Sequence, residues 1–248
     1  MPRVVGKTAM VVLLCLGLGT PAAAQQPPVH YWHQGAMPPG AIGSLQLQRG
    51  GPLPGYFQPV KIKAPDGALI SLAEAGTFGP AQQGPVTVGM LIGPVYRIRV
   101  TNIPSEYGRE VFPTVEVINR LYAPPGTETR FPIEVELTLE ELQLALSGKF
   151  VTRVIYLEDP QRALPIRQGA QGTNWFEAGP NHDPLAIADQ LGRPVAILRL
   201  GGRLPDAEGP SIDFLYGCPP VVAVAAPQSP QEPSAAEPTQ ASRSGLWR

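Results

Sequence analysis

The chain has 248 residues and a formal net charge of −1, with 31 Pro and 27 Gly but only 16% charged residues. This composition predicts one folded domain surrounded by turns, linkers and polyproline-like segments. No block of basic residues provides the concentrated positive field that binding along nucleic-acid phosphates requires, so nucleic-acid binding is excluded as a function.

The first 24 residues have the features of a secretory signal peptide. Arg3 and Lys7 make a positive amino-terminal region, residues 9–19 form an apolar run, and Pro21 precedes three alanines at 22–24 that suit signal peptidase. The run is shorter than the ~20 residues of a resident membrane helix, so we expect cleavage after the alanines rather than an anchor. The remaining chain, with two basic residues fewer, would carry a net charge of −3 and no integral membrane segment. We therefore expect an exported protein of the periplasm, cell surface or extracellular space.

Residues 25–58 are rich in Pro, Gly and Gln, lack hydrophobic periodicity, and are expected to form a flexible leader. His30 and His33 flank Tyr31-Trp32 in this leader. Prolines on both sides disfavour a helix there, and no Cys, Asp or Glu lies nearby to complete a zinc shell. A surface-docking aromatic motif is therefore favoured over a metal site.

The expected folded domain spans residues 59–205, where apolar and polar residues alternate as in half-buried strands. Segments 59–63 and 68–73 are expected to form a hairpin around Gly67, which can take the positive φ of a tight turn. Segment 150–157 is apolar on both faces apart from Arg153 and is placed at the centre of a sheet. The other predicted strands are 86–92, 95–101, 115–118, 133–137 and 195–200.

Two helices are predicted between the strands. Thr138 and Glu141 have the spacing of a capping box, and the helix that they start should end at Gly148. Asp183-Pro184 predicts the start of a second helix. Many strands with two short helical crossovers indicate a mainly β fold, an antiparallel β-sandwich of immunoglobulin-like or similar type.

Residues 206–248 form a low-complexity tail of Ala, Pro, Ser, Gln and Glu after a short predicted strand at 212–216. The tail has too little apolar surface to offset the entropy of ordering it. Cys218 is the only cysteine left after loss of the signal peptide, so an intramolecular disulfide is excluded. An idle thiol is favoured over a disulfide between two molecules.

Four stretches, at residues 95–104, 110–118, 150–160 and 193–203, carry a resemblance to known proteins. In these stretches the chain resembles a family of exported, uncharacterised proteins from planctomycete-type bacteria. The resemblance covers roughly residues 59–204 and leaves both flanks variable. It implies a shared fold and an envelope setting, but no known activity and no functional residues.

Neighbouring polar residues suggest two catalytic arrangements, and neither is supported. His182 beside Asp183 would need an activated Ser or Cys, and no Gly-x-Ser-x-Gly sequence exists. Asp183 is instead expected to cap a helix. Glu158 and Asp159 are adjacent on a strand and would point to opposite faces, so they cannot flank one glycosidic bond. We predict no catalytic residues, no metal site and no cofactor.

Arg97, Arg99, Arg153 and Arg199 recur in the middle of predicted strands. The favoured interpretation is a solvated sheet face, on which arginines discourage edge pairing. If the four arginines share a face, they would instead form a shallow cationic patch for an anionic polysaccharide or a carboxylate-rich partner.

Trp175 and Phe176 form an aromatic pair in a long loop between glycines. Such a pair could stack on a sugar or fill a partner's pocket. More often such a pair folds back and plugs the end of the sandwich.

Three functions follow from these observations. The favoured one is an exported, non-enzymatic envelope protein, a structural or protein-interaction module that contacts another envelope protein or a cell-wall polymer. The first alternative is a carbohydrate- or wall-polymer-binding module that uses Trp175, Phe176 and the strand arginines. The second is an enzyme of unrecognised type, which would need a deep pocket lined by convergent polar groups.

Overall fold

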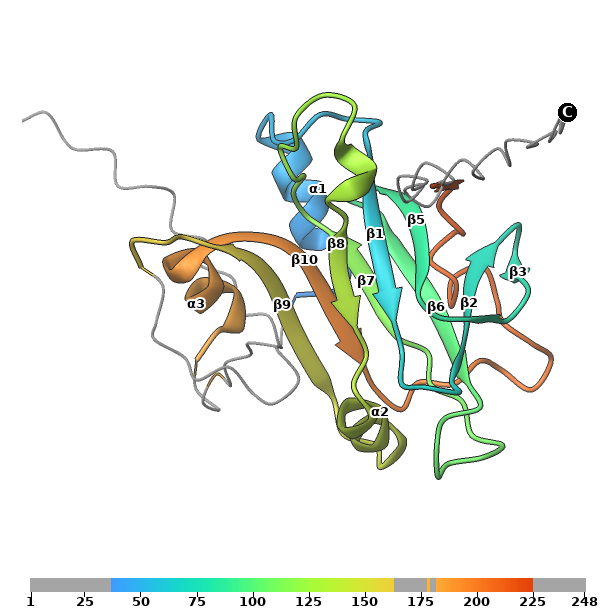
Figure 1. Cartoon of the computed structure of the whole chain (residues 1–248). Helices are drawn as coiled ribbons and strands as arrows, with labels where there is room; N and C mark the ends of the chain where they lie inside the picture. Colours follow the sequence, from blue (N-terminus) through green and yellow to red (C-terminus); the bar gives the residue numbers. More distant parts are fainter. Residues whose placement is uncertain (1–36, 163–177, 179–181, 225–248) are drawn as a thin grey trace, which may run out of the picture.

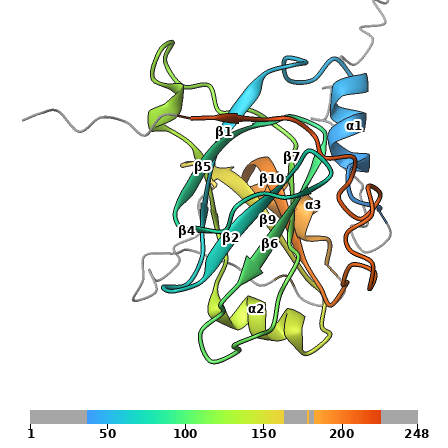
Figure 2. The same cartoon turned by 90° about the vertical axis from the view of Figure 1, so that its right-hand side faces the viewer.

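The computed structural model describes residues 37–162, 178 and 182–224 and has a mainly β fold (Figures 1 and 2). Its strands are β1 (Phe57–Lys63), β2 (Leu69–Glu74), β3 (Thr77–Phe78), β4 (Gln82–Gln83), β5 (Val86–Leu91), β6 (Val95–Thr101), β7 (Thr114–Val117), β8 (Ile133–Glu136), β9 (Val151–Glu158), β10 (Gly192–Leu200) and β11 (Val221–Ala223). Its helices are α1 (Ala41–Gln48), α2 (Leu139–Leu146), α3 (Pro184–Leu191) and the 3-10 helix η1 (Glu128–Arg130). None of the helices in these residues is long and apolar enough to cross a membrane.

The strands form two sheets. The four-stranded sheet has the order β11-β5-β1-β8, and the seven-stranded sheet has the order β3-β2-β6-β7-β10-β9, with β4 also paired to β2. Neighbouring strands run antiparallel, except for the parallel pair of β1 and β8. The predicted mainly β, antiparallel sandwich-like architecture is confirmed.

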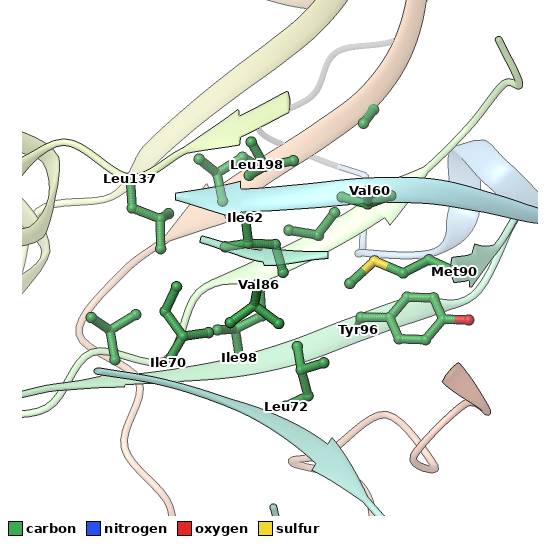
Figure 3. Close-up of a cluster of buried hydrophobic side chains, with 14 of the residues drawn as sticks. Val60, Ile62, Ile70, Leu72, Val86, Met90, Tyr96, Ile98, Leu137 and Leu198 are labelled. Atoms are coloured by element: carbon green, nitrogen blue, oxygen red, sulfur yellow. The ribbon is translucent and has the colours of Figure 1, made fainter. Parts of the chain in front are cut away.

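The core lies between the two sheets. Val60 and Ile62 of β1 point toward the seven-stranded sheet, where Ile98 of β6 and Leu198 of β10 face them (Figure 3). All four of these side chains are completely buried. Burying an aliphatic side chain of this kind contributes about 1.5–3 kcal/mol, so the period-two alternation of the strands provides the main apolar stabilisation.

The predicted hairpin of residues 59–63 and 68–73 is wrong, although its turn exists. The backbone N of Ala68 donates to Pro65 O at 3.0 Å, and Gly67 has a φ of 88°. The chain, however, leaves the four-stranded sheet at β1 and enters the seven-stranded sheet at β2. Both strands bury an apolar face in the same core from opposite sides, and therefore they face each other instead of pairing.

The strand predicted at the centre of a sheet, β9, lies at an edge. Within the described residues it pairs only with β10. Val151 and Ile155 pack against the core from this edge, whereas Leu157 is 41% exposed. The apolar residues on both faces of β9 thus reflect an edge strand that is half-buried on each side, not one enclosed by two neighbours.

Both predicted flexible arms are partly ordered. Within the expected leader, α1 forms and its Ile42 is 1% exposed. Within the expected tail, Phe214 and Leu215 are buried, and β11 pairs with β5. The predicted strand at 212–216 is a run of turns. These segments bury a few separate side chains and not a periodic stripe, which is why periodicity does not reveal them.

Both predicted helices are confirmed. Thr138 and Glu141 form a reciprocal capping box at the start of α2, with Glu141 N donating to Thr138 Oγ1 at 3.2 Å. Gly148 follows this helix with a φ of 82°. Asp183 caps α3 by accepting a hydrogen bond from Leu185 N at 2.9 Å. Local capping signals therefore located these two helix starts correctly.

Candidate functional site

Arg97 lies on the outer face of the seven-stranded sheet, which is the face turned away from the four-stranded sheet. It is nevertheless only 4% exposed. Its Nη1 donates to Phe112 O at 2.7 Å and its Nε to Phe214 O at 3.1 Å. The guanidinium carbon lies 4.5 Å from the ring centre of Phe214 and 4.9 Å from that of Tyr216. Burial lowers the pKa of Arg97. Part of the expected tail therefore covers this arginine.

Arg199 lies on the same outer face and is buried, and its carboxylate partner contacts α1. Its Nη1 donates to Glu116 Oε2 at 2.8 Å, and the side chains of Arg199 and Glu116 are 4% and 0% exposed. Glu116 Oε1 accepts a hydrogen bond from the backbone N of Gly43, also at 2.8 Å. Gly43 belongs to the first turn of α1, whose N-cap Gly40 has no side-chain acceptor. Glu116 therefore caps this helix from the neighbouring sheet.

Arg99 and Arg153 differ from this buried pair. Arg99 is partly exposed and forms an ion pair with Glu110. Arg153 lies opposite Leu198 in the register of β9 and β10, so it points to the inner side of the sheet. There Arg153 Nη1 lies 3.3 Å from Glu141 Oε1 of α2.

These positions correct the predicted arginine arrangement. Arg97, Arg99 and Arg199 share the outer face, but Arg153 lies on the inner one, so no common cationic patch forms. The solvated sheet face is also wrong for Arg97 and Arg199, because parts of both expected arms cover them. Side-chain alternation identified which arginines share a face but not which segments lie over that face.

Several other predicted residues lie outside the described part of the chain, namely Trp175, Phe176, His30 and His33. His182 is exposed, and the neighbouring Asp183 caps α3 as expected. In the described residues, no group of three or more His, Cys, Asp or Glu is close enough to hold a metal ion.

Two remaining sequence features have local structural roles. The thiol of the half-buried Cys218 accepts a hydrogen bond from Gly76 N at 3.3 Å. Asp159 follows β9, accepts a hydrogen bond from Gln161 N at 3.0 Å, and lies 3.6 Å from Arg162 Nε. The expected turn at the end of this strand is therefore present.

A cluster of alternating arginines and tyrosines lies on the surface instead. The guanidinium carbon of Arg120 is 4.3 Å from the ring centre of Tyr122 and 5.3 Å from that of Tyr56. The guanidinium carbon of Arg193 is 4.8 Å from the Tyr122 ring centre. Tyr122 is 63% exposed, and the other three side chains are half-buried. We call Tyr56, Arg120, Tyr122 and Arg193 the arginine–tyrosine stack.

Three elements of the fold position the stack. Tyr56 immediately precedes β1, Arg120 and Tyr122 follow β7, and Arg193 lies at the start of β10. The segment after β7 is fixed by the backbone, because Asn119 N donates to Val195 O and Leu121 N donates to the buried Gln58 Oε1 at 2.7 Å. The antiparallel pairing of β7 with β10 brings the end of one strand to the start of the other.

The two cations of the stack have no anionic partner among the described residues. Neither Arg120 nor Arg193 forms an ion pair there. No described group accepts a hydrogen bond from the buried Nε of Arg120. Guanidinium groups stack well on aromatic rings and keep their in-plane N–H groups for bidentate contacts with carboxylates. The stack is thus chemically suited to bind an anion.

A small pocket of about 120 Å³ adjoins the stack between α1, α3 and the start of β10. Its apolar lining consists of Ile42, Ile118, Leu185 and Pro194, and its polar lining consists of Gln46, Asn119, Asp189 and Arg193. Arg193 belongs to both the pocket and the stack. The pocket and the stack therefore adjoin at Arg193, and together they are our candidate functional site.

Only two of the four residues of the stack can be recognised from the sequence. Arg120 and Tyr122 are two positions apart just after a strand, and side chains at that spacing in an extended chain lie on the same side. The Arg120–Tyr122 pair could therefore have been found from the sequence alone. Tyr56 and Arg193 come from distant segments and reach the pair only through the assembly of the two sheets.

The chain matches no protein-family model, no curated protein and no solved structure. Its function must therefore be inferred from the geometry of the candidate site. The resemblance to a family of exported planctomycete-type proteins stays a prediction.

Proposed function

We propose that the protein is an exported, non-enzymatic module that binds an anionic glycan of the cell envelope. The arginine–tyrosine stack carries the proposal, because the ring of Tyr122 holds two guanidinium groups that no described carboxylate neutralises. A hydrogen bond to a charged group contributes about 1.5–3 kcal/mol. Export is supported by the basic, apolar and small-residue regions of residues 1–24.

The surroundings of the stack favour a glycan over a protein partner. Tyr and Arg are also enriched in protein–protein hot spots, which lie in well-packed, fully desolvated pockets. The stack, in contrast, is open to solvent, with Tyr122 63% exposed, and it borders a pocket that Gln46, Asn119 and Asp189 make polar, which suits a ligand rich in hydroxyl groups. An acidic polysaccharide supplies both the hydroxyl groups and the carboxylates that the stack requires.

A sedimentation assay tests this proposal. The chain starting at Gln25 would be mixed with native envelope fragments before and after protease treatment of the fragments. We expect saturable co-sedimentation that survives the protease. Replacing both Arg120 and Arg193 by Gln should weaken binding at least about tenfold, since two charge-assisted contacts are lost.

Arg109→Gln provides the matched control. Arg109 contacts Glu106 and the Leu146 O of α2, away from the stack, and α2 lies at the opposite end of the molecule from α1 (Figure 1). This variant should bind like the unaltered chain. Binding that protease treatment abolishes would indicate a protein partner, and no binding to any fragment would overturn the proposal.

A further inference from the structure

We infer that the end of the molecule that carries α2 docks on the surface of an anionic lipid bilayer. The docking surface consists of three exposed side chains on three loops, Tyr107, Phe150 and Leu204, together with the basic residues Lys149 and Arg203. It is separate from the arginine–tyrosine stack and adds a lipid partner to the proposed function.

The three most exposed large apolar side chains of the described residues all belong to this surface. Tyr107 is 77% exposed, Phe150 67% and Leu204 65%. They lie in the loop between β6 and β7, in the turn between α2 and β9, and in the segment after β10. Single exposed apolar residues are ordinary on a protein, whereas a group of them at one place marks an interaction site.

Contacts between the three loops hold them together at one end of the sandwich, beside α2 (Figures 1 and 2). Arg109 Nη2 donates to Leu146 O at 2.6 Å and so joins the β6–β7 loop to the end of α2. A Cβ added at Gly201 would lie 3.1 Å from Cδ2 of Phe150, so this ring lies beside the segment after β10. Leu204 is three residues further, within about 11 Å along the chain.

Two of the loops end in turns that project from the body of the protein. Gly108 follows Tyr107, and Gly148 precedes Lys149 and Phe150. The two glycines have φ values of 78° and 82°, which a side chain disfavours. A Cβ added at either glycine would meet no atom within 4 Å. The aromatic residues are therefore carried on tips that an approaching surface reaches first.

Basic residues accompany two of the three tips. Lys149 directly precedes Phe150, and Arg203 directly precedes Leu204. Both basic side chains are exposed, and neither forms an ion pair with any described residue. A Lys or Arg close to an anionic membrane surface is attracted to it, so these two residues favour the same approach as the apolar tips.

The acidic residues of the β6–β7 loop do not oppose this attraction, because both are paired. Glu106 Oε2 lies 3.1 Å from Arg109 Nη1, and Glu110 forms an ion pair with Arg99. Asp206 is exposed two residues beyond Leu204. Its charge repels an anionic surface, and Asp206→Asn should therefore strengthen the binding proposed here.

A bilayer suits this surface better than a folded protein partner does. The apolar side chains stand on separate loops with polar residues between them, whereas protein–protein hot spots lie in well-packed pockets. The interfacial region of a bilayer needs no complementary shape, and it accepts a Tyr with its ring in an apolar layer and its hydroxyl group in water. Apolar insertion and attraction to anionic lipid are each weak, but together they give reversible peripheral binding.

The docking surface and the stack lie at opposite ends of β1. Tyr56 of the stack immediately precedes this strand. At the other end of the strand, Lys63 O accepts a hydrogen bond at 2.8 Å from Leu137 N, just before α2. A chain that docks through the α2 end therefore holds the stack away from the bilayer, where a glycan of the envelope can reach it.

Sedimentation with lipid vesicles tests the inference. The chain starting at Gln25 would be mixed with vesicles of phosphatidylcholine alone and with vesicles of phosphatidylcholine and phosphatidylglycerol in equal parts. These vesicles contain neither glycan nor protein. We expect at least about tenfold tighter binding to the vesicles that contain phosphatidylglycerol, and this binding should weaken as the salt concentration rises toward about 1 M.

Substitutions assign the binding to the docking surface. Phe150→Ser combined with Leu204→Ser should weaken it at least about tenfold, because two apolar side chains no longer insert. Lys149→Gln combined with Arg203→Gln should remove the preference for phosphatidylglycerol. Phe131→Ser is the matched control, since Phe131 is 50% exposed but lies before β8, whereas α2 follows that strand. It should bind like the unaltered chain, and urea denaturation verifies that each variant is folded.

Four results would overturn the inference. They are no binding to either kind of vesicle, equal binding to both, binding that the double serine variant retains, and an equal loss in Phe131→Ser. Loss of vesicle binding in the Arg120→Gln/Arg193→Gln variant would also overturn it, because the stack would then be the lipid contact. Wall polymer freed of lipid separates the two proposals. A chain that binds vesicles but not this polymer would uphold the docking surface and overturn the proposed function.

Discussion

The outer faces of the two sheets carry the same kind of ion pair in different surroundings. On the four-stranded sheet, Lys63 Nζ lies 2.7 Å from Glu134 Oε2, and the two side chains are 36% and 54% exposed. On the seven-stranded sheet, Arg199 Nη1 lies 2.8 Å from Glu116 Oε2, and the side chains are 4% and 0% exposed. Nearly identical contacts therefore lie in water on one sheet and in the protein interior on the other.

The difference comes from what covers each sheet. Figure 2 shows α1 and the orange-red segment before β11 on the side of the molecule opposite to β5, where they cover the seven-stranded sheet. Charged residues on an uncovered face keep their water. Those beneath a cover must find protein partners, because an unpaired buried charge costs several kcal/mol. The two ion pairs should therefore respond very differently to the same substitution.

The largest effect is expected for Glu116→Ala. This substitution leaves Arg199 as a buried cation without its carboxylate and removes the acceptor of Gly43 N. Breaking a buried ion pair by removing one partner costs about 3–5 kcal/mol. The free energy of unfolding, measured by urea denaturation, should fall by that amount, and amide hydrogen exchange in α1 should accelerate.

Glu134→Ala is the matched control, because it removes the same side chain from an equally short but exposed contact. It should cost less than about 1 kcal/mol. Adding Arg199→Met to Glu116→Ala should restore part of the lost stability, since no unpaired buried charge remains. Similar losses for Glu116→Ala and Glu134→Ala would contradict the difference drawn between the two faces.

A smaller effect is expected for Gly43→Ala, at the point where α1 crosses the seven-stranded sheet. A Cβ at Gly43 would lie 2.6 Å from Gly93 Cα and 2.8 Å from Gly93 O. Backbone atoms cannot move aside as a flexible side chain can, so α1 must shift. We expect a loss of about 1–3 kcal/mol in the free energy of unfolding, although Ala favours a helix over Gly.

Gly79→Ala serves as the control for this substitution. A Cβ at Gly79 would approach no atom closer than 3.6 Å, an ordinary contact. Its free energy of unfolding should change by no more than about 0.5 kcal/mol. If Gly43→Ala proved as stable as Gly79→Ala, the close packing of α1 on the sheet would be refuted.

The ordered arm also shows how far the sequence could predict this fold. Thr138 and Asp183 start their helices with their own side chains, and both starts were predicted correctly from local signals. The acceptor for the first turn of α1 is instead Glu116, on a strand far along the chain. No local pattern reveals a helix that is capped from a sheet, and so the arm was predicted to be flexible.

The same reasoning applies to the candidate site. Arg97 was considered for ligand binding because it alternates with apolar residues, but residues Phe214 and Tyr216 cover it. Arg120 follows β7, and Arg193 lies in β10 ahead of its β-bulge, so the alternation of the neighbouring apolar residues gives no information about their exposure. Whether an arginine is available to a ligand depends on the segments packed around it. These segments are distant in the sequence and are brought together only by the tertiary structure.

The smallest expected effect is the loss, in acid, of the stability that the exposed Lys63–Glu134 pair contributes. The hydrogen bond from Lys63 holds the pKa of Glu134 below its ordinary value of 4.5. Because the folded-state pKa is the lower one, this stabilisation is present above pH 4.5 and is lost as the pH falls through the folded-state pKa. Glu134→Gln should therefore cost about 0.2–1 kcal/mol at neutral pH and nothing in strong acid, where both chains lack the charge.

The effect of salt on stability distinguishes the exposed Lys63–Glu134 pair from the buried Arg199–Glu116 pair. Screening weakens an exposed pair, so the neutral-pH difference between the unaltered chain and Glu134→Gln should shrink as the salt concentration rises toward about 1 M. The loss caused by Glu116→Ala should persist, because Arg199 is buried and dissolved ions do not reach it. Urea denaturation at low and high salt measures both quantities. A Glu116→Ala loss that salt removes would mean that the outer face of the seven-stranded sheet is open to solvent.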